Sequence, residues 1–243
     1  MPDKSQIQKM FRTISPTYDL LNTMLSFHID AWWRRKTVAV FRPQWRRSHK
    51  QLMLDLCSGT LDLSLQIAKN SQPQVSIVAL DFCYEMLREG REKIPIDQQN
   101  RVFLVCADSE CLPLRDNIAT GAVVGFGLRN LIDRPKGLKE MNRTLKPGAK
   151  LAVLEFSQPK SRFFRALYYF YFLCILPKIG GLISGNARAY QYLPESVLKF
   201  YTPQELQEIM QKVGFQRVRF SLLTGGIAAL HVGEKRYAGS GDC

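Results

Sequence analysis

Apolar runs and helix-like segments alternate along the chain from Gln51 onward. Seven short apolar runs, rich in β-branched residues, read QLMLDLC, VSIVALD, RVFLVCAD, ATGAVVGFG, AKLAVLEFS, FQRVRFSLL and GIAALHVG. Segments in which apolar positions recur with the helical period separate most of them. Strands that are apolar on both faces and alternate with helices are typical of a parallel sheet covered on both sides. The pattern therefore predicts an α/β fold built on a doubly wound sheet.

Two helices of this domain are marked by signals at their ends. One begins near Asp133 and stops at the KPG turn, and the other begins with the capping box TPQE at 202–205 and ends at Gly214. The last two apolar runs follow each other with no helix between them. We therefore expect the final strand to pair antiparallel at that end of the sheet.

Two regions lie outside the alternation. Residues 1–50 are predicted to form an N-terminal helical region, and residues 158–200 an insertion in the α/β domain that covers 51–243. The insertion contains RALYYFYFLCILPK, in which 12 residues separate Arg165 from Lys178. As a helix they span about 18 Å, against about 30 Å of bilayer hydrocarbon, so this segment cannot cross a membrane alone. A buried helix, a lid over an apolar substrate and an interfacial anchor all remain open.

Positive charge is the first hint of a partner. The formal net charge is +13, and residues 1–50 contain ten Lys and Arg against three acids. Such charge favours nucleic acid, anionic lipid or an acidic protein, although a basic protein without any such partner is an equal alternative. The clusters WWRRK and RPQWRR suit either a membrane interface or nucleic-acid bases.

Cysteine and histidine give no sign of a metal site. The six cysteines form no CxxC pair, and the three histidines lie far apart. The first residues, MPDKSQIQKMFR, are too polar for a secretory signal. We therefore expect reduced thiols and a cytosolic or organellar-matrix compartment.

Acidic residues follow three successive predicted strands. Asp55 and Gly59 lie in the stretch LDLCSGTLDL at the end of the first strand, Asp81 ends the second and Asp108 the third. Ligands of doubly wound sheets bind beyond the carboxyl ends of the strands. A carboxylate at the second strand can accept from both ribose hydroxyls, and one at the third can accept from an adenine amino group. Each acid alone could be a helix cap, but three in register predict an adenosine-bearing ligand.

The identity of this ligand follows from what the loop lacks. GxGxxG is absent, which disfavours NAD, and GxxxxGK[ST] is absent, which disfavours ATP. S-adenosylmethionine has an adenosine and a cationic sulfonium but no phosphate. A loop that contains Asp55 and Asp62 tolerates such a ligand, whereas a phosphate site would need positive charge.

Motifs along nearly the whole chain carry a family resemblance. They are MFRTISPTYDLLNTMLSFHIDAWWRRKTV, LDLCSGTLDL, LDF, ADSECLPL, FGLRNLIDRPKGLKEMNRTLKPGAKLAVLEFSQP, YQYLPESVLKF and LLTGGIAALHVGEK. With them the chain resembles the class I S-adenosylmethionine methyltransferases and, within these, the ubiquinone/menaquinone-biosynthesis C-methyltransferases. The loop is shared by many methyltransferases, whereas FGLRN with LEFS, PTYDLLN and GIAALHVG is specific. The resemblance implies a Rossmann-like, mostly parallel sheet with an antiparallel last strand, N-terminal helices and a helical insertion.

The resemblance also implies a set of cofactor contacts. Carried over position by position, they are Asp55, Gly59, Thr60, Leu61, Asp81, Phe82, Asp108, Ser109 and Gly125. Gly125 stands where some members have a serine, so a side-chain contact is lost there. Leu61 stands where the family normally has glycine. We expect this leucine to crowd the methionine part of the cofactor, to be strained if φ is positive, and to weaken cofactor binding.

The reaction that the resemblance implies is methylation of a ring carbon on a polyprenylated quinol. Demethylmenaquinol is the favoured acceptor, with a phytylated naphthoquinol or a ubiquinol precursor as alternatives. The ring must lose or share a phenolic proton, and its carbon must lie about 3–3.5 Å from the methyl group. Candidates to hold the proton or the phenolate are Arg129, Tyr18, Asn130, His231 and Asp19. Arg129 is the strongest candidate: it could hold a developing phenolate or position a base through a water, whereas a guanidinium is itself a poor base.

A prenylated substrate also implies a membrane partner. The apolar insertion and the cationic N-terminal region predict peripheral association of a cytoplasmic protein with anionic lipid. The family further suggests a homodimer. A nucleic-acid methyltransferase is a rival, but no [DN]PP[YF] motif or pair of catalytic cysteines is present. A non-catalytic scaffold is the other rival, and Leu61 is the feature that favours it.

Overall fold

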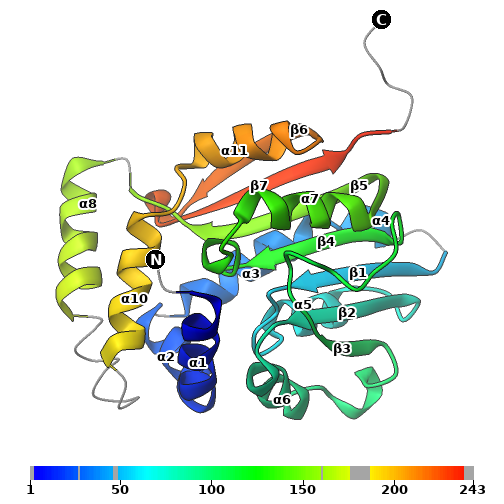
Figure 1. The fold of residues 1–243 in the computed structure, drawn as a ribbon, viewed down its shortest axis with the longest axis horizontal. Helices are drawn as coiled ribbons and strands as arrows, with labels where there is room; N and C mark the ends of the chain where they lie inside the picture. Colours follow the sequence, from blue (N-terminus) through cyan, green and yellow to red (C-terminus); the bar gives the residue numbers. More distant parts are fainter. Residues whose placement is uncertain (1–2, 27, 46–48, 160, 176–186, 238–243) are drawn as a thin grey trace, which may run out of the picture.

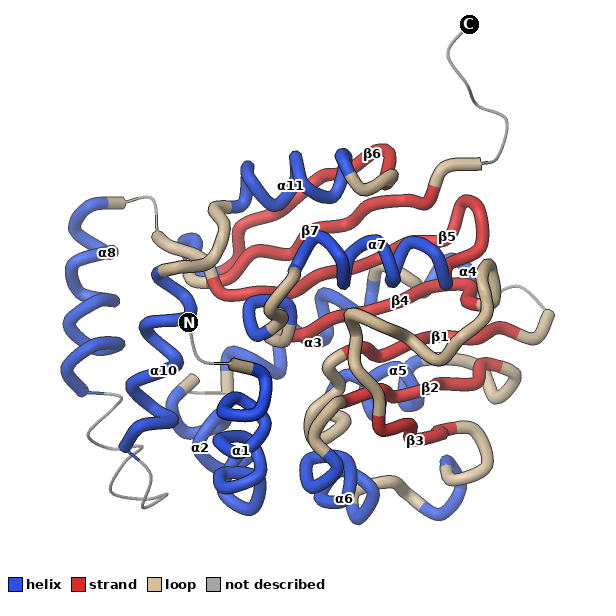
Figure 2. The backbone as a smooth tube through the Cα atoms, in the orientation of Figure 1, coloured by secondary structure: helices blue, strands red, loops and turns tan. Residues whose placement is uncertain are grey.

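A seven-stranded sheet forms the centre of the molecule, with helices on both faces (Figures 1 and 2). The computed structural model describes residues 3–26, 28–45, 49–159, 161–175 and 187–237. The strands are β1 (Gln51–Leu56), β2 (Val75–Asp81), β3 (Val102–Cys106), β4 (Ala119–Gly125), β5 (Leu145–Phe156), β6 (Phe215–Leu223) and β7 (Ala228–Lys235). Their order is β3-β2-β1-β4-β5-β7-β6.

Six strands run in one direction and one is reversed. Strands β1 to β5 pair in parallel, and β7 pairs antiparallel with both β5 and β6. This confirms the predicted doubly wound sheet and its antiparallel last strand. The last strand is not at the edge, however, because it lies between β5 and β6.

Both faces of the sheet are buried, which explains the near-continuous apolar runs. Along β1, Met53 packs into the cluster on one face, whereas Leu54 and Leu56 pack into the cluster on the other. The first face is covered by α3 (Ile29–Ala39), α4 (Arg42–Trp45), α5 (Asp62–Asn70) and α6 (Tyr84–Glu92). The second is covered by α7 (Arg134–Thr144) and α11 (Pro203–Lys212). Short 3-10 turns η2 (Ile96–Gln98) and η5 (Thr224–Gly226) join neighbouring elements.

The two helices predicted from their end signals are present. Asp133 caps α7 by accepting a hydrogen bond from the Lys136 amide at 2.9 Å. Thr202 and Glu205 form the capping box of α11, with Pro203 as its first residue. These caps satisfy backbone amides that have no partner inside the helix.

Apart from α3 and α4, the helices outside the alternation gather beyond the carboxyl ends of the parallel strands (Figure 1). They comprise α1 (Lys4–Ile14), η1 (Ser15–Thr17), α2 (Tyr18–Leu25), α8 (Arg162–Tyr169), the π-helical turn η4 (Phe170–Ile175) and α10 (Ala187–Leu198). Side chains of α1, α2, α8, η4 and α10 share one apolar cluster. Within the described residues no helix is long and apolar enough to cross a membrane. The end of the segment RALYYFYFLCILPK, residues 176–178, lies outside the described residues.

Trp33 joins the N-terminal helices to the sheet domain. Its ring is 3% exposed and lies 5.9 Å from the ring of Phe126 and 6.1 Å from that of Phe156, measured between centroids. Its indole nitrogen donates to Thr224 Oγ1 at 2.8 Å. The adjacent Trp32 is 40% exposed.

Replacement of these two tryptophans should therefore have unequal effects. We expect Trp33→Ala to lower the free energy of unfolding by about 3–5 kcal/mol, because it leaves a cavity between α3 and the sheet. Trp32→Ala is the matched control and should change it by about 0.5 kcal/mol or less. Urea denaturation followed by circular dichroism measures both. Equal effects, or a separate transition for the N-terminal helices, would contradict the single packed unit described above.

Candidate active site

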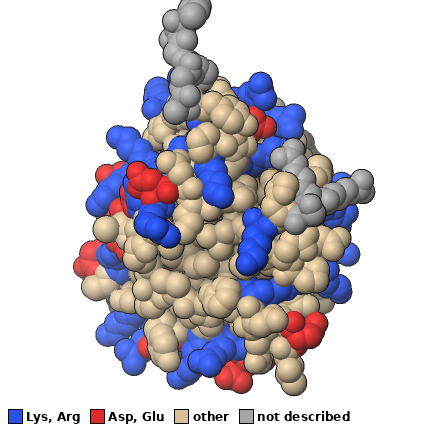
Figure 3. Space-filling view, turned by 90° about the vertical axis from the view of Figure 1, so that its right-hand side faces the viewer, with Lys and Arg blue, Asp and Glu red and all other residues tan. Residues whose placement is uncertain are grey.

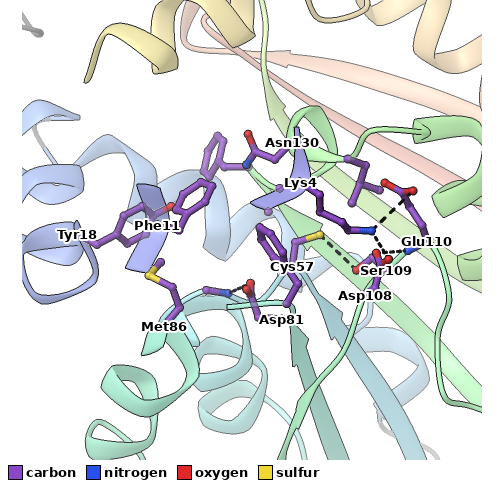
Figure 4. A pocket seen from close by; sticks show the side chains of 16 residues that line it. Lys4, Phe11, Tyr18, Cys57, Asp81, Met86, Asp108, Ser109, Glu110 and Asn130 are labelled. Carbon is purple, nitrogen blue, oxygen red and sulfur yellow. Dashed lines mark hydrogen bonds and ion pairs between the residues drawn. The ribbon is translucent and has the colours of Figure 1, made fainter. Parts of the chain in front are cut away.

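A cavity of about 600 Å³, part of it open to solvent, lies beyond the carboxyl ends of β1 to β4 (Figure 4). This volume is typical of small-molecule sites, which span about 300–1,000 Å³. We call it the loop cavity. Its lining residues include Lys4, Phe11, Tyr18, Cys57, Gly59, Asp81, Phe82, Met86, Asp108, Ser109, Glu110, Gly125, Phe126 and Asn130. The cavity lies where the strand order reverses between β1 and β4, as expected for a doubly wound sheet.

The carboxylate of Asp81 holds two of the loops together. It accepts from the Gly59 amide at 2.8 Å and from the Cys83 amide at 2.9 Å. Gly59 has φ +52°, in the left-handed region that favours glycine. Asp81 is 6% exposed, and this burial raises its pKa to about 6 despite the two amide donors. Its lone pairs that remain can accept further donors from a ligand.

Asp55 has an acceptor without a partner. Its Oδ2 atom accepts from the amide and the hydroxyl of Ser64 at 2.8 and 2.6 Å. Its Oδ1 atom is buried and has no hydrogen-bond partner among the described residues. Burial raises the pKa of Asp55 to about 7. Because a buried polar atom is normally paired, this oxygen is suited to a ligand's donor, such as an ammonium group.

Asp55 lines a second space of about 350 Å³, the small cavity, which adjoins the loop cavity. The small cavity shares Tyr18, Cys57, Gly59, Gly125 and Phe126 with the loop cavity. Its other lining residues are Arg34, Asp55, Ser58, Thr60, Asp62 and Leu63. Gly125 leaves room here, because a Cβ atom built on it would lie 2.6 Å from Leu63 Cδ1.

The adenine-side residues are covered by α1. Asp108 accepts from Lys4 Nζ and, at 2.9 Å, from the Glu110 amide. Burial alone would raise the pKa of Asp108, but these two donors lower it below its ordinary value. Ser109 Oγ lies 3.4 Å from Cys57 Sγ, and Phe82 accepts from Gln8 Nε2 of α1 at 2.7 Å through its carbonyl. Lys4 thus donates to one of the Asp108 carboxylate oxygens, which are the predicted acceptors for the adenine amino group.

Leu61 does not lie where the sequence predicts. Its φ is +71°, so the predicted strain is present, but its side chain is fully buried and lines neither the loop cavity nor the small cavity. It packs against Gly90 of α6, where an added Cβ atom would lie 2.4 Å from Leu61 Cγ. The prediction that Leu61 crowds the cofactor is therefore corrected. Because α6 has glycine at position 90, the leucine side chain fills the space there and points away from the two cavities.

The linings of the loop and small cavities are acidic. Their carboxylates are Asp55, Asp62, Asp81, Asp108 and Glu110, and their cationic side chains are Lys4 and Arg34. Both cations are already paired with acids. A ligand with a sulfonium and an ammonium group and no phosphate fits this lining, and the unpartnered Asp55 oxygen fits the same ligand.

A third space of about 640 Å³, the aromatic cavity, adjoins the loop cavity and shares Phe11, Tyr18 and Phe126 with it. Its remaining lining residues are Met10, Ile14, Ser26, Asp30, Arg34, Arg129, Phe156, Tyr192 and Leu193. It is largely apolar, with a few polar groups, as is usual for a site that binds an organic ring.

Arg129 lies in η3 (Leu128–Asn130), directly after β4, and is held in place by Glu155. Its guanidinium pairs with the Glu155 carboxylate at 3.1 Å, and both residues are buried. It also donates to the Phe126 carbonyl and, at 3.3 Å, to Ser196 Oγ. Glu155 was not predicted from the sequence, although its place in LEFS at the end of a strand is a usable signal. The neighbouring Asn130 accepts from the Tyr192 hydroxyl at 3.1 Å.

His231 is apart from the other predicted catalytic residues. It lies inside β7, and its Nε2 atom is 2.9 Å from the Pro203 carbonyl oxygen at the start of α11. Burial lowers its pKa to about 4, and it lines none of the three cavities described above. The strand places it away from the carboxyl ends of the parallel strands, where the candidate site lies.

Ion pairs fasten the N-terminal helices to the cofactor loop. Asp19 accepts from the Thr60 hydroxyl and, at 2.6 Å, from Lys93 Nζ, which also donates to Asp62 at 2.8 Å. Arg34 pairs with Asp62 at 3.1 Å. Asp19 and Thr60 are therefore engaged with each other. Lys93 carried no sequence signal, because its partners lie on other elements, and the pairing of Arg34 with Asp62 could not be predicted for the same reason.

Comparison with known proteins agrees with this geometry. The model of the ubiE/COQ5 methyltransferase family matches residues 2–235. A ubiquinone/menaquinone biosynthesis C-methyltransferase UbiE from Geotalea uraniireducens (strain Rf4) is 45% identical over 231 residues, which cover 95% of this chain and 96% of the relative. A demethylmenaquinone methyltransferase from Deinococcus radiodurans is 43% identical over 235 residues, which cover 96% of this chain and 95% of the relative.

Solved structures support the fold alone. A SAM-dependent methyltransferase from Aquifex aeolicus has a TM-score of 0.57 and 19% identity, over 81% of this chain and 88% of the other. The [4+2]-cyclase SpnF has a TM-score of 0.69 and 15% identity, over 98% of each chain. Because a cyclase shares the architecture, the activity must be argued from the site.

The position of Leu61 leads to a prediction about stability and binding. Leu61→Gly should leave the affinity for S-adenosylmethionine unchanged within about threefold, because the leucine does not line the cavities. It should lower the free energy of unfolding by about 1–3 kcal/mol, since the cavity left behind costs more than the backbone strain that glycine relieves. Calorimetric titration and urea denaturation measure the two effects.

A double-mutant cycle with Gly90→Ala is the matched control for this prediction. Gly90→Ala should destabilise the wild-type protein through its contact with Leu61, and should cost less in the Leu61→Gly background. Much tighter cofactor binding by Leu61→Gly would instead support the hypothesis that Leu61 crowds the cofactor.

The raised pKa of Asp81 predicts a pH dependence of cofactor binding. The ionised carboxylate accepts from ribose hydroxyls, so the contribution of Asp81 to the affinity should be full above about pH 6 and should fall below it as Asp81 takes up a proton, by about tenfold per pH unit at the limit. The Asp81→Asn variant should bind S-adenosylmethionine weakly at every pH and should lose the part of the pH dependence that comes from Asp81. The Asp55→Asn variant measures the separate contribution of Asp55, whose pKa is also raised. An affinity of the wild-type protein that stays constant through this range would contradict the assignment.

Proposed function

Because the chain belongs to the ubiE/COQ5 methyltransferase family and is an S-adenosylmethionine-dependent C-methyltransferase, we propose that it methylates a ring carbon of demethylmenaquinol to give menaquinol. The observation that carries this proposal is the junction of two unlike cavities. An acidic loop cavity meets a largely apolar aromatic cavity at Phe11, Tyr18 and Phe126. A cationic methyl donor and an apolar ring can therefore meet at this junction.

The acidic half would hold the cofactor through residues from successive strands. Asp81 would accept from the ribose hydroxyls, Asp108 and Ser109 would face the adenine, and Asp55 would accept from the ammonium group. When bound, S-adenosylmethionine supplies an electrophilic methyl group on a positively charged sulfur. Helix α1 covers this half through Lys4 and Phe11 and limits its contact with water.

The apolar half would hold the quinol ring. The rings of Phe126 and Phe156 lie 4.5 Å apart between centroids and offer flat surfaces for it. Arg129, fixed by Glu155, would stabilise negative charge that develops on a ring oxygen without reorganising. Tyr18 and Asn130 are placed to orient the ring oxygens, since Tyr18 lines both halves and Asn130 lines the loop cavity.

The elements around the aromatic cavity expose apolar side chains that could meet a membrane. These are Leu20 of α2, Trp32 of α3, Phe170 and Leu173 of η4, and Leu198 of α10. Lys36 Nζ lies 5.4 Å above the Trp32 ring. The end of the molecule opposite the N-terminal helices also carries Lys and Arg side chains, interspersed with Asp and Glu, mostly around the rim of the face (Figure 3). Charge alone therefore does not select the membrane-facing end, and the apolar side chains support our choice of the cavity end.

The scaffold hypothesis loses the feature that favoured it. It depended on a cofactor loop damaged by Leu61, and this side chain packs against Gly90 instead. The nucleic-acid hypothesis rests on the net charge of +13 and on the clusters WWRRK and RPQWRR, and a steep salt dependence of RNA or DNA affinity would support it. The relatives named for demethylmenaquinone and for ubiquinone/menaquinone biosynthesis have similar identities, so ring preference is left to the assay.

Transfer of labelled methyl from S-adenosylmethionine to a reduced acceptor in detergent tests the proposal. We expect turnover of demethylmenaquinol with a kcat/KM at least about tenfold above that of a ubiquinol precursor, a difference of about 1.4 kcal/mol in transition-state binding. A phytylated naphthoquinol tests whether the tail matters. Absence of product from all three acceptors would refute the proposed activity, and a preference for the ubiquinol precursor would refute the choice of ring.

Vesicle flotation tests the membrane surface. We expect the protein to float with anionic vesicles at low salt, and less at high salt, since each nearby cation contributes about 1 kcal/mol. Phe170→Ala should reduce binding several-fold by removing an exposed apolar side chain. Phe103→Ala is the matched control, because Phe103 is a comparably exposed ring on the edge strand β3. Equal loss in both variants, or no flotation of the wild type, would contradict the assigned face.

A further inference from the structure

The aromatic cavity contains a carboxylate that the reaction scheme above does not use. Asp30 lies in the first turn of α3, lines the cavity and is only 7% exposed. Its Oδ1 atom accepts from the Ser26 hydroxyl at 2.6 Å, and its Oδ2 atom accepts from Arg34. Each carboxylate oxygen has two lone pairs, so both oxygens can still accept a hydrogen bond from a bound ring.

Arg34 places this carboxylate near the point of methyl transfer. It lines both the aromatic cavity and the small cavity, and its guanidinium carbon lies 5.8 Å from the centroid of Phe126. Burial would lower its pKa, but the charges of Asp62 and Asp30 outweigh burial and raise it, so the group stays cationic. The other titratable groups that line the aromatic cavity are Tyr18, Arg129 and Tyr192, from α2, η3 and α10.

The chemistry requires a group that can take a phenolic proton. A guanidinium has no acceptor, and an un-ionised tyrosine is no stronger a base than the phenol itself. Asn130 is neutral. Among the described residues that line the aromatic cavity, Asp30 is the one carboxylate, and a carboxylate can accept the proton.

We propose that Asp30 is the proton acceptor for the quinol, an assignment that rests on the proposed function. The ring O–H bond breaks and its proton passes to the Asp30 carboxylate. The ring carbon then forms a bond to the methyl carbon, the carbon–sulfur bond breaks, and its electron pair remains on sulfur. Loss of the proton from the methylated carbon to solvent restores the aromatic ring, and the ring oxygen takes its proton back from Asp30, so one proton is released overall. Arg34 and Arg129 flank the same cavity, and their charges favour the phenolate form of the ring.

A purely structural role for Asp30 makes different predictions. An acid in the first helical turn with an arginine four residues later stabilises a helix without any contact with substrate. Loss of that role would lower stability and leave the pH profile of turnover unchanged. The test therefore needs readouts that depend on proton transfer and on the ring hydroxyl.

The first readout is the pH dependence of turnover in Asp30→Asn, which keeps the shape of the side chain. We expect kcat to fall about 100-fold or more at neutral pH, with the KM for S-adenosylmethionine unchanged. Activity of the variant should rise with pH toward the ionisation of the quinol itself, whereas the wild type should level off. Asp30→Glu should recover part of the activity. Asp116→Asn, an exposed carboxylate at Arg143 outside the cavities, is the matched control and should behave as wild type.

The second readout does not depend on methyl transfer. The wild type should bind 1-naphthol about tenfold more tightly than 1-methoxynaphthalene, which lacks the hydroxyl donor, and Asp30→Asn should lose most of this preference. Unchanged kcat and pH profile in Asp30→Asn, or loss of activity with an unchanged profile and unchanged naphthol preference, would overturn the assignment. If the wild type methylates no quinol, the proposed function fails, and the naphthol comparison still decides whether Asp30 binds a ring hydroxyl.

Discussion

The hydrogen bonds that Asp81 accepts from the loops on either side of it determine the geometry of the candidate site. Through the amides of Gly59 and Cys83 this buried carboxylate fixes the loop after β1 against the loop after β2. The cost of burying the charge is visible in its raised pKa. A ligand that donates further hydrogen bonds to the same oxygens would repay that cost, which links cofactor binding to the stability of the loops.

The N-terminal helices complete the cavities, and they are fastened by two kinds of contact. Trp33 provides apolar burial against the rings of Phe126 and Phe156, which line the aromatic cavity. Around the cofactor loop the contacts are polar and include Asp19, Lys93 and Arg34. The packing of Trp33 thus stabilises the fold at any salt concentration. The strength of the ion pairs, in contrast, depends on the salt concentration and on the charge of a bound ligand.

The sequence was sufficient to predict the parallel sheet, because both faces are buried and the strands are apolar throughout. The caps of α7 and α11 are local signals, and the structure bears them out. The position of β7 between β5 and β6 could not be predicted, since a hairpin specifies its internal pairing but not which strand meets the rest of the sheet. Asp30 and Glu155 were not predicted. The partners of Asp30 are local, but the cavity that it lines is built by elements remote in the chain, and Glu155 is paired with Arg129 of another element. His231 was predicted as a catalytic residue, and its position inside β7 places it outside the three cavities.

The contact between Leu61 and Gly90 couples two positions that lie 29 apart in sequence. A Cβ atom added at position 90 would lie 2.4 Å from Leu61 Cγ and 2.9 Å from the backbone carbon of Thr60. The Thr60 backbone by itself therefore favours glycine at 90, and the leucine at 61 narrows the same space further. A larger residue at 90 would need both a smaller residue at 61 and a shift of the loop, so substitutions at the two positions are not independent.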